Sequence, residues 1–415
     1  MRKQMIALAA LCPLTVFAVS PVHNRVIDYV PAPGQFVNVL PEWEDGDDSE
    51  AIAAKALQYM TEEGYYISLG AWGGYVTVGF ERTIVNVPGK RDIYIEGNAF
   101  QSSQSSTKGG NSEPGVVMVA YDINHNGIPD GNEWFEIAGS EYSKSIHNYE
   151  VSYIRPASDN DDIMWMDNQG NSGFVNRIPF HTQPYWPQWL SGRSKLTFQG
   201  CRLPDNSVNE GTADDPYIVL KAFDYGYADN YPNFSDKEGL VRNEGAMIDI
   251  DWAVDANGNA VKLPGVDFVR IYTGVNQTNG ILGENSTEVV RVVNTHSVGT
   301  GDAESVDESI VIDEKVLAEF LARYGGVESL DNSGLRLYVD QSGLVSFTLY
   351  EEALAQVFDL KGRCLYSELM PEGRGSVDLS SYSNGIYLVS VARETGKVVE
   401  GENFKKKNSH SGISE

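Results

Sequence analysis

The chain has 415 residues, enough for two or three domains with hydrophobic cores. Its 31 Lys and Arg against 58 Asp and Glu give a formal net charge of −27, which argues against nucleic acid or an anionic membrane surface as a partner. This charge suits solubility outside the cell, a neutral or cationic ligand, or bound calcium. Abundant Tyr, Trp and Gly (22, 7 and 41 residues) and many short apolar runs favour a mostly β protein.

Residues 1–20 are typical of a signal peptide. Arg2 and Lys3 precede an apolar run that is too short to span a bilayer. Cleavage is expected after Ser20, with cleavage after Ala18 as the alternative. No later stretch is long and apolar enough for a transmembrane helix, so the sequence predicts an exported protein at the cell surface, on the outer membrane or in the medium.

The cysteines predict no disulfide bond, and they favour ordinary export over a lipid anchor. Cys12 lies in the leader, where a lipid would be attached, but Leu11 is too large for the residue that precedes a lipidated cysteine. Cys201 and Cys364 lie in regions that look like different domains, so no disulfide is expected.

Residues 21–304 predict a β-sandwich ligand-binding domain. After an acidic segment, one helix is expected through "EAIAAKALQYMTEE", capped by Asp48 or Ser49. Short β-branched or aromatic runs then follow, among them "GYVTVGF", "GVVMVAYDI", "YEVSYIRP", "KLTFQGC", "AMIDIDWAV" and "DFVRIYTGV". No helical pattern separates these runs, which favours a two-sheet sandwich over a parallel α/β sheet.

The last hundred residues predict a linker and a second, smaller β domain. Residues 305–330 hold an acidic stretch and a short helix in "DEKVLAEFLARYGG". Residues 331–405 predict a small C-terminal β-sandwich, and residues 406–415 a polar tail. The helix is expected to bury one apolar side, made of Val316, Leu317, Phe320 and Leu321.

Two segments of this smaller domain, "VFDLKGRCLYS" and "VDLSSYSNGIYLVSVARETGKVV", resemble the type IX sorting-like C-terminal domain of secreted Bacteroidetes proteins. The resemblance implies export to the cell surface. That family usually ends just after its last strand, whereas this chain continues with "EGENFKKKNSHSGISE". The domain is therefore either a working sorting signal or a β-sandwich retained for structure.

A second resemblance covers residues 35–300. It rests on the segments "LGAWGGYVTVGFERTIVNVPGKRDIYIEGNAF", "SEPGVVMVAYDINHNGIPDGNEWFEIAGSEY", "FDYGYADNYPN" and "IDWAVDANGNAVKLPGVDFVRIYTGVNQ". These segments are similar to a Bacteroidetes cell-surface family associated with corrinoid (vitamin B12) uptake, with BtuH-like members. The resemblance implies cobalamin as the ligand and a TonB-dependent outer-membrane transporter as partner. The first segment also resembles jelly-roll binding modules, which implies a jelly-roll-like sandwich.

The stretch "DINHNGIPDGNE" matches the calcium-loop pattern D-x-[DN]-x-[DN]-G-x5-E at every specified position. Two features argue against a helical calcium sensor: the flanks look like strands, and Pro129 lacks the N–H that normally pairs two such loops. The alternatives are a calcium-braced loop and a hairpin turn. Calcium is the expected cofactor, without an organic catalytic one, and the predicted ligands are Asp122, Asn124, Asn126, Ile128 (through its carbonyl), Asp130 and Glu133.

Loop aromatics predict a surface for stacking on a sugar or a corrin ring. Pro184 and Pro187 keep "HTQPYWPQWL" extended, so its rings cannot all turn inward along a helix. "MWMD" and "DYGYADNYPN" add further rings; the alternative is that these aromatics only pack over the ends of the sandwich. The predicted ligand contacts are Trp165, His181, Tyr185, Trp186, Trp189, Tyr225, Tyr227 and Tyr231.

Signatures of catalysis are weak. None of the six histidines has a paired zinc spacing, and neither G-x-S-x-G nor a P-loop occurs. Asp249 and Asp251 would alternate on a strand and share its solvent face, so they are not expected to form a glycosidase pair. The sequence favours a non-catalytic, cell-surface protein that captures a corrinoid; the alternatives are a carbohydrate-binding or glycosidase-like protein and a structural or adhesive one.

Overall fold

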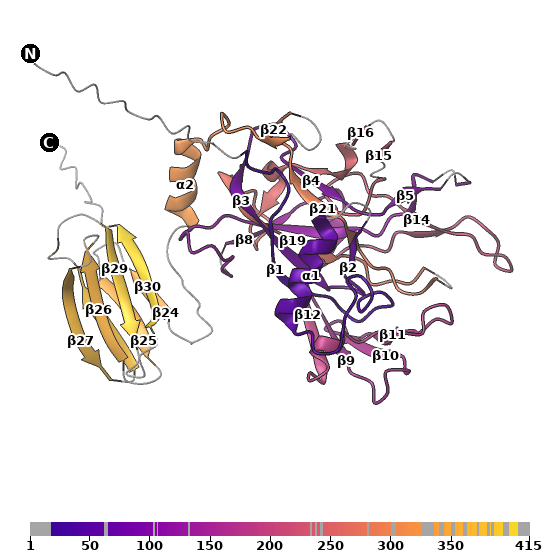
Figure 1. Ribbon diagram of the computed structural model, residues 1–415, viewed down its shortest axis with the longest axis horizontal. Coiled ribbons are helices and arrows are strands. Elements are labelled where there is room, and N and C mark those ends of the chain that lie inside the picture. Colours follow the sequence, from indigo (N-terminus) through magenta and orange to yellow (C-terminus); the bar gives the residue numbers. More distant parts are fainter. Residues whose placement is uncertain are drawn as a thin grey trace, which may run out of the picture.

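The computed structural model in Figure 1 describes residues 18–405, with gaps. Residues left out of the description are 62–64, 103, 106, 132, 233–234, 237–238, 241–243, 280–281, 300–303, 325–335, 340–343, 350–352, 360–362, 372, 380–381, 383–385, 393–397 and 406–415. Most of the predicted signal peptide and the polar tail therefore lie outside the described residues.

An antiparallel six-stranded sheet forms the centre of the larger body, in the order β1-β3-β19-β7-β8-β18. Val78 pairs with Val269, which pairs in turn with Val119, so strands far apart in sequence are neighbours. The strands are β1 (Arg25–Val30), β3 (Tyr75–Val85), β7 (Gly115–Ala120), β8 (Trp134–Ile137), β18 (Ala253–Val254) and β19 (Gly265–Thr273).

One face of this sheet packs against a helix and a three-stranded sheet in the order β17-β4-β21. Val76 and Val78 meet Ile52 and Met60 of the helix here, all of them buried. The elements are α1 (Ser49–Thr61), β4 (Ile93–Glu96), β17 (Met247–Ile248) and β21 (Arg291–Asn294). The helix begins as predicted, because the Asp48 carboxylate accepts the N–H groups of Glu50 and Ala51.

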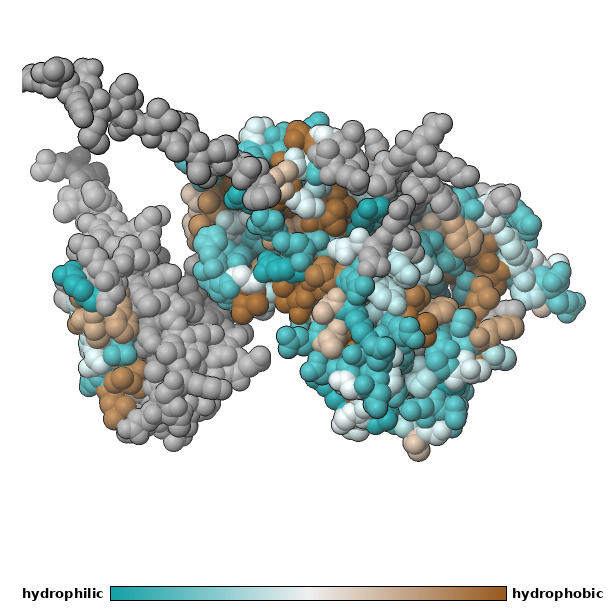
Figure 2. Space-filling view, in the orientation of Figure 1, coloured by the Kyte–Doolittle hydropathy of each residue, from teal (hydrophilic) through white to brown (hydrophobic). Residues whose placement is uncertain are grey.

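The opposite face packs against a four-stranded sheet in the order β11-β10-β9-β12. Trp72, Tyr149, Tyr153 and Tyr272 fill this second core, and the Trp72 indole donates to the carbonyl of Gly274 at 3.1 Å. The strands are β9 (Ile146–Ile154), β10 (Ile163–Asp167), β11 (Ser172–Val175) and β12 (Lys195–Arg202). Figure 2 shows one side of the surface, where hydrophobic residues form separate patches among hydrophilic ones.

The prediction of a mostly β protein with few helices is confirmed, but the central sheet is covered on both faces rather than on one. The reason is visible in β3, β7 and β19, whose alternate positions are apolar on either side: Val76 faces the first core and Tyr75 the second. Small sheets surround these layers, in the orders β13-β14-β6-β5, β2-β20, β15-β16 and β22-β23.

The remaining elements of the body are short. The strands are β2 (Ile67–Ser68), β5 (Phe100–Gln101), β6 (Gly109–Asn111), β13 (Ser207–Asn209), β14 (Ile218–Lys221), β15 (Ser235–Asp236), β16 (Gly239–Leu240), β20 (Glu288–Val289), β22 (Ser297–Val298) and β23 (Ser305–Val306). The 3-10 turns are η1 (Tyr142–Lys144), η2 (Gln188–Leu190), η3 (Glu244–Ala246) and η4 (Ile250–Trp252).

Helix α2 (Glu314–Tyr324) packs onto the body, although it was predicted inside a linker. Phe320 is buried in the first core, and Leu317 and Tyr324 pack beside it, as predicted for Phe320 and Leu317. Leu321 is exposed, so its place on the predicted apolar side is wrong, and Tyr324 takes part instead.

The smaller C-terminal module consists of two antiparallel sheets, ordered β24-β25-β28 and β27-β26-β29-β30 (Figure 1), which agrees with a small β-sandwich. Its strands are β24 (Arg336–Val339), β25 (Leu344–Leu349), β26 (Ala353–Asp359), β27 (Cys364–Met370), β28 (Gly373–Asp378), β29 (Ile386–Ala392) and β30 (Val398–Lys405). Cys201 and Cys364 are both free thiols. No helix in the described part of the chain is long and apolar enough to cross a membrane.

Candidate functional site

The Asp122–Glu133 stretch connects β7 to β8, two neighbouring strands of the central sheet, and not two helices. Asp122 is buried, and its carboxylate accepts the N–H groups of Asn126 at 3.0 Å and Gly127 at 2.8 Å. Gly127 has a φ of +81°, which a residue without a side chain adopts at little cost. The loop is a tight turn built around one aspartate.

The other acids of this loop also bind its own donors. Glu133 accepts the N–H groups of Ile123 at 2.7 Å and Asp130 at 2.8 Å, and burial, helped by Asp130 and Asp122, raises its pKa to about 7. Asp130 accepts the side-chain amides of Asn124 at 2.6 Å and Asn126 at 3.1 Å. The exposed Ile128 donates its N–H to the side chain of Asn126. Calcium binding here stays a prediction.

Three of the predicted stacking residues are core residues. Tyr185, Trp186 and Tyr227 are all at most 2% exposed and belong to the second core. The Trp186 indole donates to the carbonyl of Leu190, and the Tyr185 hydroxyl accepts the N–H of Ile178. Their prediction as an exposed platform is wrong, because burying rings of this size is strongly favourable and their polar atoms find partners inside.

Four other predicted contacts are half-buried and lie against protein groups. The Trp165 ring lies over Gly173 on the inner side of the β10–β11 hairpin, and Trp189 stacks on Tyr29 with ring centres 5.8 Å apart. The His181 ring lies against Phe36, with ring centres 4.5 Å apart. The Lys108 ammonium group lies 4.4 Å from the centre of the Tyr231 ring.

Tyr225 is the predicted aromatic that the structure exposes, with 41% of its surface accessible. It leans on Trp252 with ring centres 4.6 Å apart, and the guanidinium of Arg91 lies 4.0 Å from the centre of a Trp252 ring. Tyr225 therefore presents one ring surface to solvent from a supported position, whereas the eight predicted residues do not form one platform.

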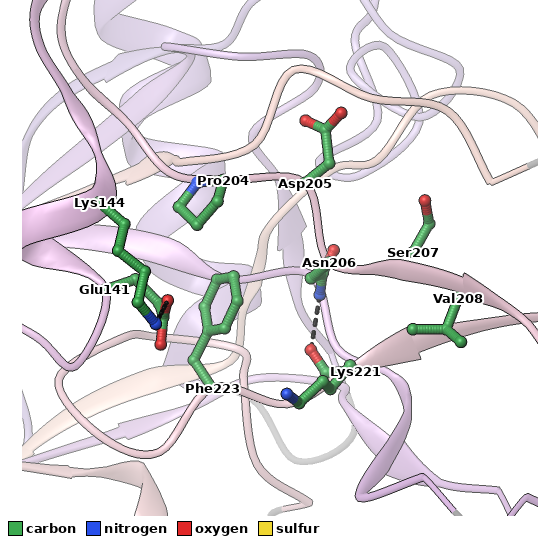
Figure 3. Close-up of a pocket in the computed structure, with 9 residues that line it drawn as sticks. All are labelled: Glu141, Lys144, Pro204, Asp205, Asn206, Ser207, Val208, Lys221 and Phe223. Carbon is green, nitrogen blue, oxygen red and sulfur yellow. Dashed lines mark hydrogen bonds and ion pairs between the residues drawn. The ribbon is translucent and has the colours of Figure 1, made fainter.

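A cavity of about 210 Å³ lies beside the segment that carries Tyr225. Figure 3 shows Phe223 in the middle of the group, with Glu141 and Lys144 on one side and Asn206 and Lys221 on the other. Glu141 and Lys144 form an ion pair at 2.7 Å, and the Asn206 amide donates to the carbonyl of Lys221 at 2.8 Å. The lining residues are Glu141, Lys144, Pro204, Asp205, Asn206, Ser207, Val208, Lys221 and Phe223.

Hydrogen bonds fix the Tyr225 segment against the wall of this cavity. Ser140 donates its N–H to the carbonyl of Tyr225 at 3.0 Å and accepts the N–H of Asp224 with its hydroxyl at 3.1 Å. The Tyr227 hydroxyl accepts the N–H of Glu141 at 2.9 Å. Sequence reasoning found Tyr225 but missed the cavity, because its walls come from three separate parts of the chain that carry no common motif.

Asp249 and Asp251 lie on a turn, so the predicted strand alternation is wrong there. Asp249 caps η4 by accepting the N–H of Asp251 at 3.0 Å and lies 3.5 Å from Arg91. Asp251 accepts the side-chain amide of Asn86. Burial raises the pKa of Asp249. The two acids are neighbours on one turn and do not face each other across a cleft.

Glu136, His147 and Cys201 also converge, with candidate ligand atoms within 4.8 Å of one another. The distances in sequence hide this trio, because β8, β9 and β12 bring it together. Burial and the nearby Glu136 carboxylate raise the pKa of the Cys201 thiol. The Cys201 thiol and the Glu136 carboxylate of this trio are joined by a side-chain hydrogen bond.

Comparison with known families assigns the C-terminal module. Residues 341–402 match the family of secretion system C-terminal sorting domains. No curated protein matches the chain. The module is similar to these sorting domains, as the first sequence resemblance predicted, and it indicates export to the cell surface or the extracellular space. The resemblance to corrinoid-associated proteins stays a prediction.

Proposed function

We propose that this exported protein binds a small-molecule nutrient at the cell surface without converting it, and that the nutrient is a corrinoid. The observation that carries the proposal is the exposed Tyr225 ring, two residues along the chain from the cavity-lining Phe223, in a protein that bears a sorting domain. The identity of the ligand rests on the sequence resemblance of residues 35–300.

The size of the cavity limits how a corrinoid would bind. A cavity of about 210 Å³ is smaller than the roughly 300–1,000 Å³ usual for small-molecule sites, so it accepts one part of a large ligand. A corrin ring carries amide side chains, which suit the ammonium of Lys144, the carboxylate of Glu141 and the amide of Asn206. The ring itself would lie against Tyr225 outside the cavity.

The same features support a glycan as the alternative ligand. A single sugar ring is small enough for the cavity, and sugars stack on exposed tyrosines while charged groups bind their hydroxyls. In either case we propose capture followed by transfer to a TonB-dependent outer-membrane transporter, with calcium as a structural ion. The net charge of −27 gives no support to nucleic acid as a partner.

Calorimetric titration of the full chain with cyanocobalamin and a glycan panel tests the proposal. We expect corrinoid binding at micromolar concentrations, and a loss of about tenfold in affinity for Tyr225→Ala, which corresponds to about 1.4 kcal/mol. Tyr65→Ala is the matched control, because Tyr65 is similarly exposed (47%) and also leans on a ring, that of Tyr59 at 5.1 Å.

Binding of a glycan but of no corrinoid would identify the ligand as a glycan and exclude the corrinoid. Equal effects of the two tyrosine substitutions on affinity would show that Tyr225 is not part of the binding site. No binding of either ligand class would leave a structural or adhesive role.

A further inference from the structure

Three carboxylates meet inside the larger body, far apart in sequence. Glu113 lies between β6 and β7, Asp229 follows the residue that bridges to Gly115, and Glu288 begins β20. Their candidate ligand oxygens all lie within 4.8 Å of one another. The three residues are only 9%, 1% and 4% exposed. We call this group the carboxylate cluster.

The polypeptide supplies the cluster with neutral donors. Asp229 accepts the N–H groups of Asn98 and Ala99 through Oδ1, each at 2.8 Å, and that of Glu288 through Oδ2 at 2.9 Å. Its φ of +48° holds this carboxylate in an unusual backbone conformation.

Glu113 is held in the same way, by amides. It accepts the side-chain amide of Asn111 at 3.0 Å, the side-chain amide of Asn285 at 3.2 Å and the N–H of Ser286 at 3.3 Å. These bonds orient the carboxylates but leave their charges uncompensated.

No Lys, Arg or His side chain in the described part of the chain forms an ion pair with the cluster. Glu96 shows the contrast, because it is also 9% exposed but pairs with the guanidinium of Arg291. Burial of an unpaired carboxylate costs several kcal/mol. Three such groups at one point need a cation or bound protons.

The pKa values of the cluster are raised, as expected for buried carboxylates without a cationic partner. Burial, with a further contribution from the Glu284 carboxylate, raises the pKa of Glu113 to about 7. Burial and then the charge of Glu113 raise the pKa of Asp229 far above its usual range, and the pKa of Glu288 rises for the same reasons.

Two amide oxygens around the cluster have no hydrogen-bond partner. One is Oδ1 of Asn285, a residue that is 1% exposed and whose amide nitrogen already binds Glu113. The other is the buried Oδ1 of Asn98, whose backbone N–H binds Asp229. Unpartnered buried carbonyl oxygens are costly and need an explanation. A bound cation explains both oxygens and the unpaired carboxylates at once.

We propose that Glu113, Asp229 and Glu288 bind a calcium ion, with the side-chain oxygens of Asn98 and Asn285 completing the shell. Every group offered is an oxygen, and calcium accepts six to eight oxygens from carboxylates and amide carbonyls in flexible geometry. Magnesium prefers to keep several waters, and zinc prefers nitrogen and sulfur ligands.

The position of the cluster gives the ion a structural consequence. It joins the start of β7 in the central sheet to β20 and to the end of β4, and Asp229 belongs to the segment that also carries Tyr225 and Tyr227. Gly97 allows this approach, because a Cβ there would lie 2.3 Å from Oδ1 of Asp229. Calcium at this point would hold that segment against the central sheet.

Calorimetry on the full chain, stripped with EDTA and titrated with CaCl₂, tests the assignment. The measurements use an Asp122→Ala background, so that the β7–β8 loop does not contribute. Glu288→Gln keeps the volume and removes one ligand charge, and we expect calcium affinity to fall by about 100-fold or more. Glu96→Gln, a buried control (9% exposed) with its own arginine, should retain the affinity.

Equal calcium affinity in the two glutamine variants would overturn the proposal, and so would a response to Zn²⁺ but not to Ca²⁺. Circular dichroism in EDTA checks folding, and we expect Glu288→Gln to melt no lower than its parent because it removes a repelling charge. If that variant does not fold, native mass spectrometry of the parent decides: one tightly bound calcium supports the site, and none excludes it.

Discussion

The β7–β8 loop and the carboxylate cluster both gather three acids, yet they differ in what they do with the charges. In the loop, Asp122 and Glu133 accept backbone N–H groups from residues within the same turn. In the cluster, Glu113, Asp229 and Glu288 come from three distant segments, and burial, followed by the charge of Glu113, raises the pKa values of Asp229 and Glu288. The loop acids are hydrogen-bonded by groups of one turn, whereas the cluster gathers buried acids from separate segments beside two amide oxygens without a partner.

A match to a sequence motif therefore differs from a set of groups in the structure that lack partners. The loop matches a calcium pattern at every specified position, but its amides Asn124 and Asn126 both donate to Asp130. The cluster matches no pattern, but two amide oxygens beside it have no partner. Because the three carboxylates of the cluster lie within 4.8 Å of one another beside two unpartnered amide oxygens, we expect the cluster to bind calcium more tightly than the loop does.

The largest expected effect is on the pH dependence of stability without calcium. The pKa of Glu113 is raised from 4.5 to about 7 in the folded state, so folding binds a proton and stability is greatest at low pH. The free energy of unfolding should fall as pH rises through this window, by about 3 kcal/mol for Glu113 alone. Urea denaturation in EDTA between pH 4.5 and 8 measures it.

Calcium should reverse this slope in the cluster, since the ion stabilises the ionised carboxylates. Glu133 of the loop also has a pKa raised to about 7, so Glu133→Gln serves as the control. In EDTA, Glu133→Gln and Glu113→Gln should each remove a similar part of the slope, but only Glu113→Gln should abolish its reversal by calcium. Loss of the reversal in Glu133→Gln and not in Glu113→Gln would contradict the comparison.

A pair of glycines gives the next largest contrast. Gly97→Ala would bring a Cβ to 2.3 Å from Oδ1 of Asp229 and 2.9 Å from its Cα, so we expect a loss of about 2 kcal/mol in stability together with weaker calcium binding. Gly127→Ala meets only Arg25 Nη1, at an ordinary contact distance of 4.0 Å, and a positive φ, which costs about 1 kcal/mol. Thermal melts with and without calcium measure both.

Only the cluster variant should change the calcium-dependent part of the melting temperature. A calcium response lost in Gly127→Ala and kept in Gly97→Ala would assign the ion to the loop.

Local rules explain what the sequence predicted correctly. The strands from β3 to β21 follow alternation and turn residues, α1 begins at the capping Asp48, and the sorting-domain segments lie in the matched residues 341–402. Pro184 and Pro187 predict an extended segment with exposed rings, but burial in the second core stabilises Trp186 more than exposure would.

Tertiary pairing explains what the sequence could not predict. The cluster exists because Gly115 bridges to Ala228 and β20 pairs with β2, and neither contact has a spacing or residue type that marks it in advance. The cavity at Phe223 depends in the same way on the contact between Ser140 and the Tyr225 segment.

The smallest expected effect belongs to Asp122→Ala in the loop. Its carboxylate satisfies two backbone N–H groups, so its loss should lower the free energy of unfolding by about 1 kcal/mol. In calorimetry we expect it to remove only the weaker of two calcium-binding steps, because an ion there must displace hydrogen bonds that the loop already makes. An unchanged titration would mean that the loop is a turn and binds no calcium, and loss of the tighter step would mean that the motif, rather than the buried cluster, is the main site.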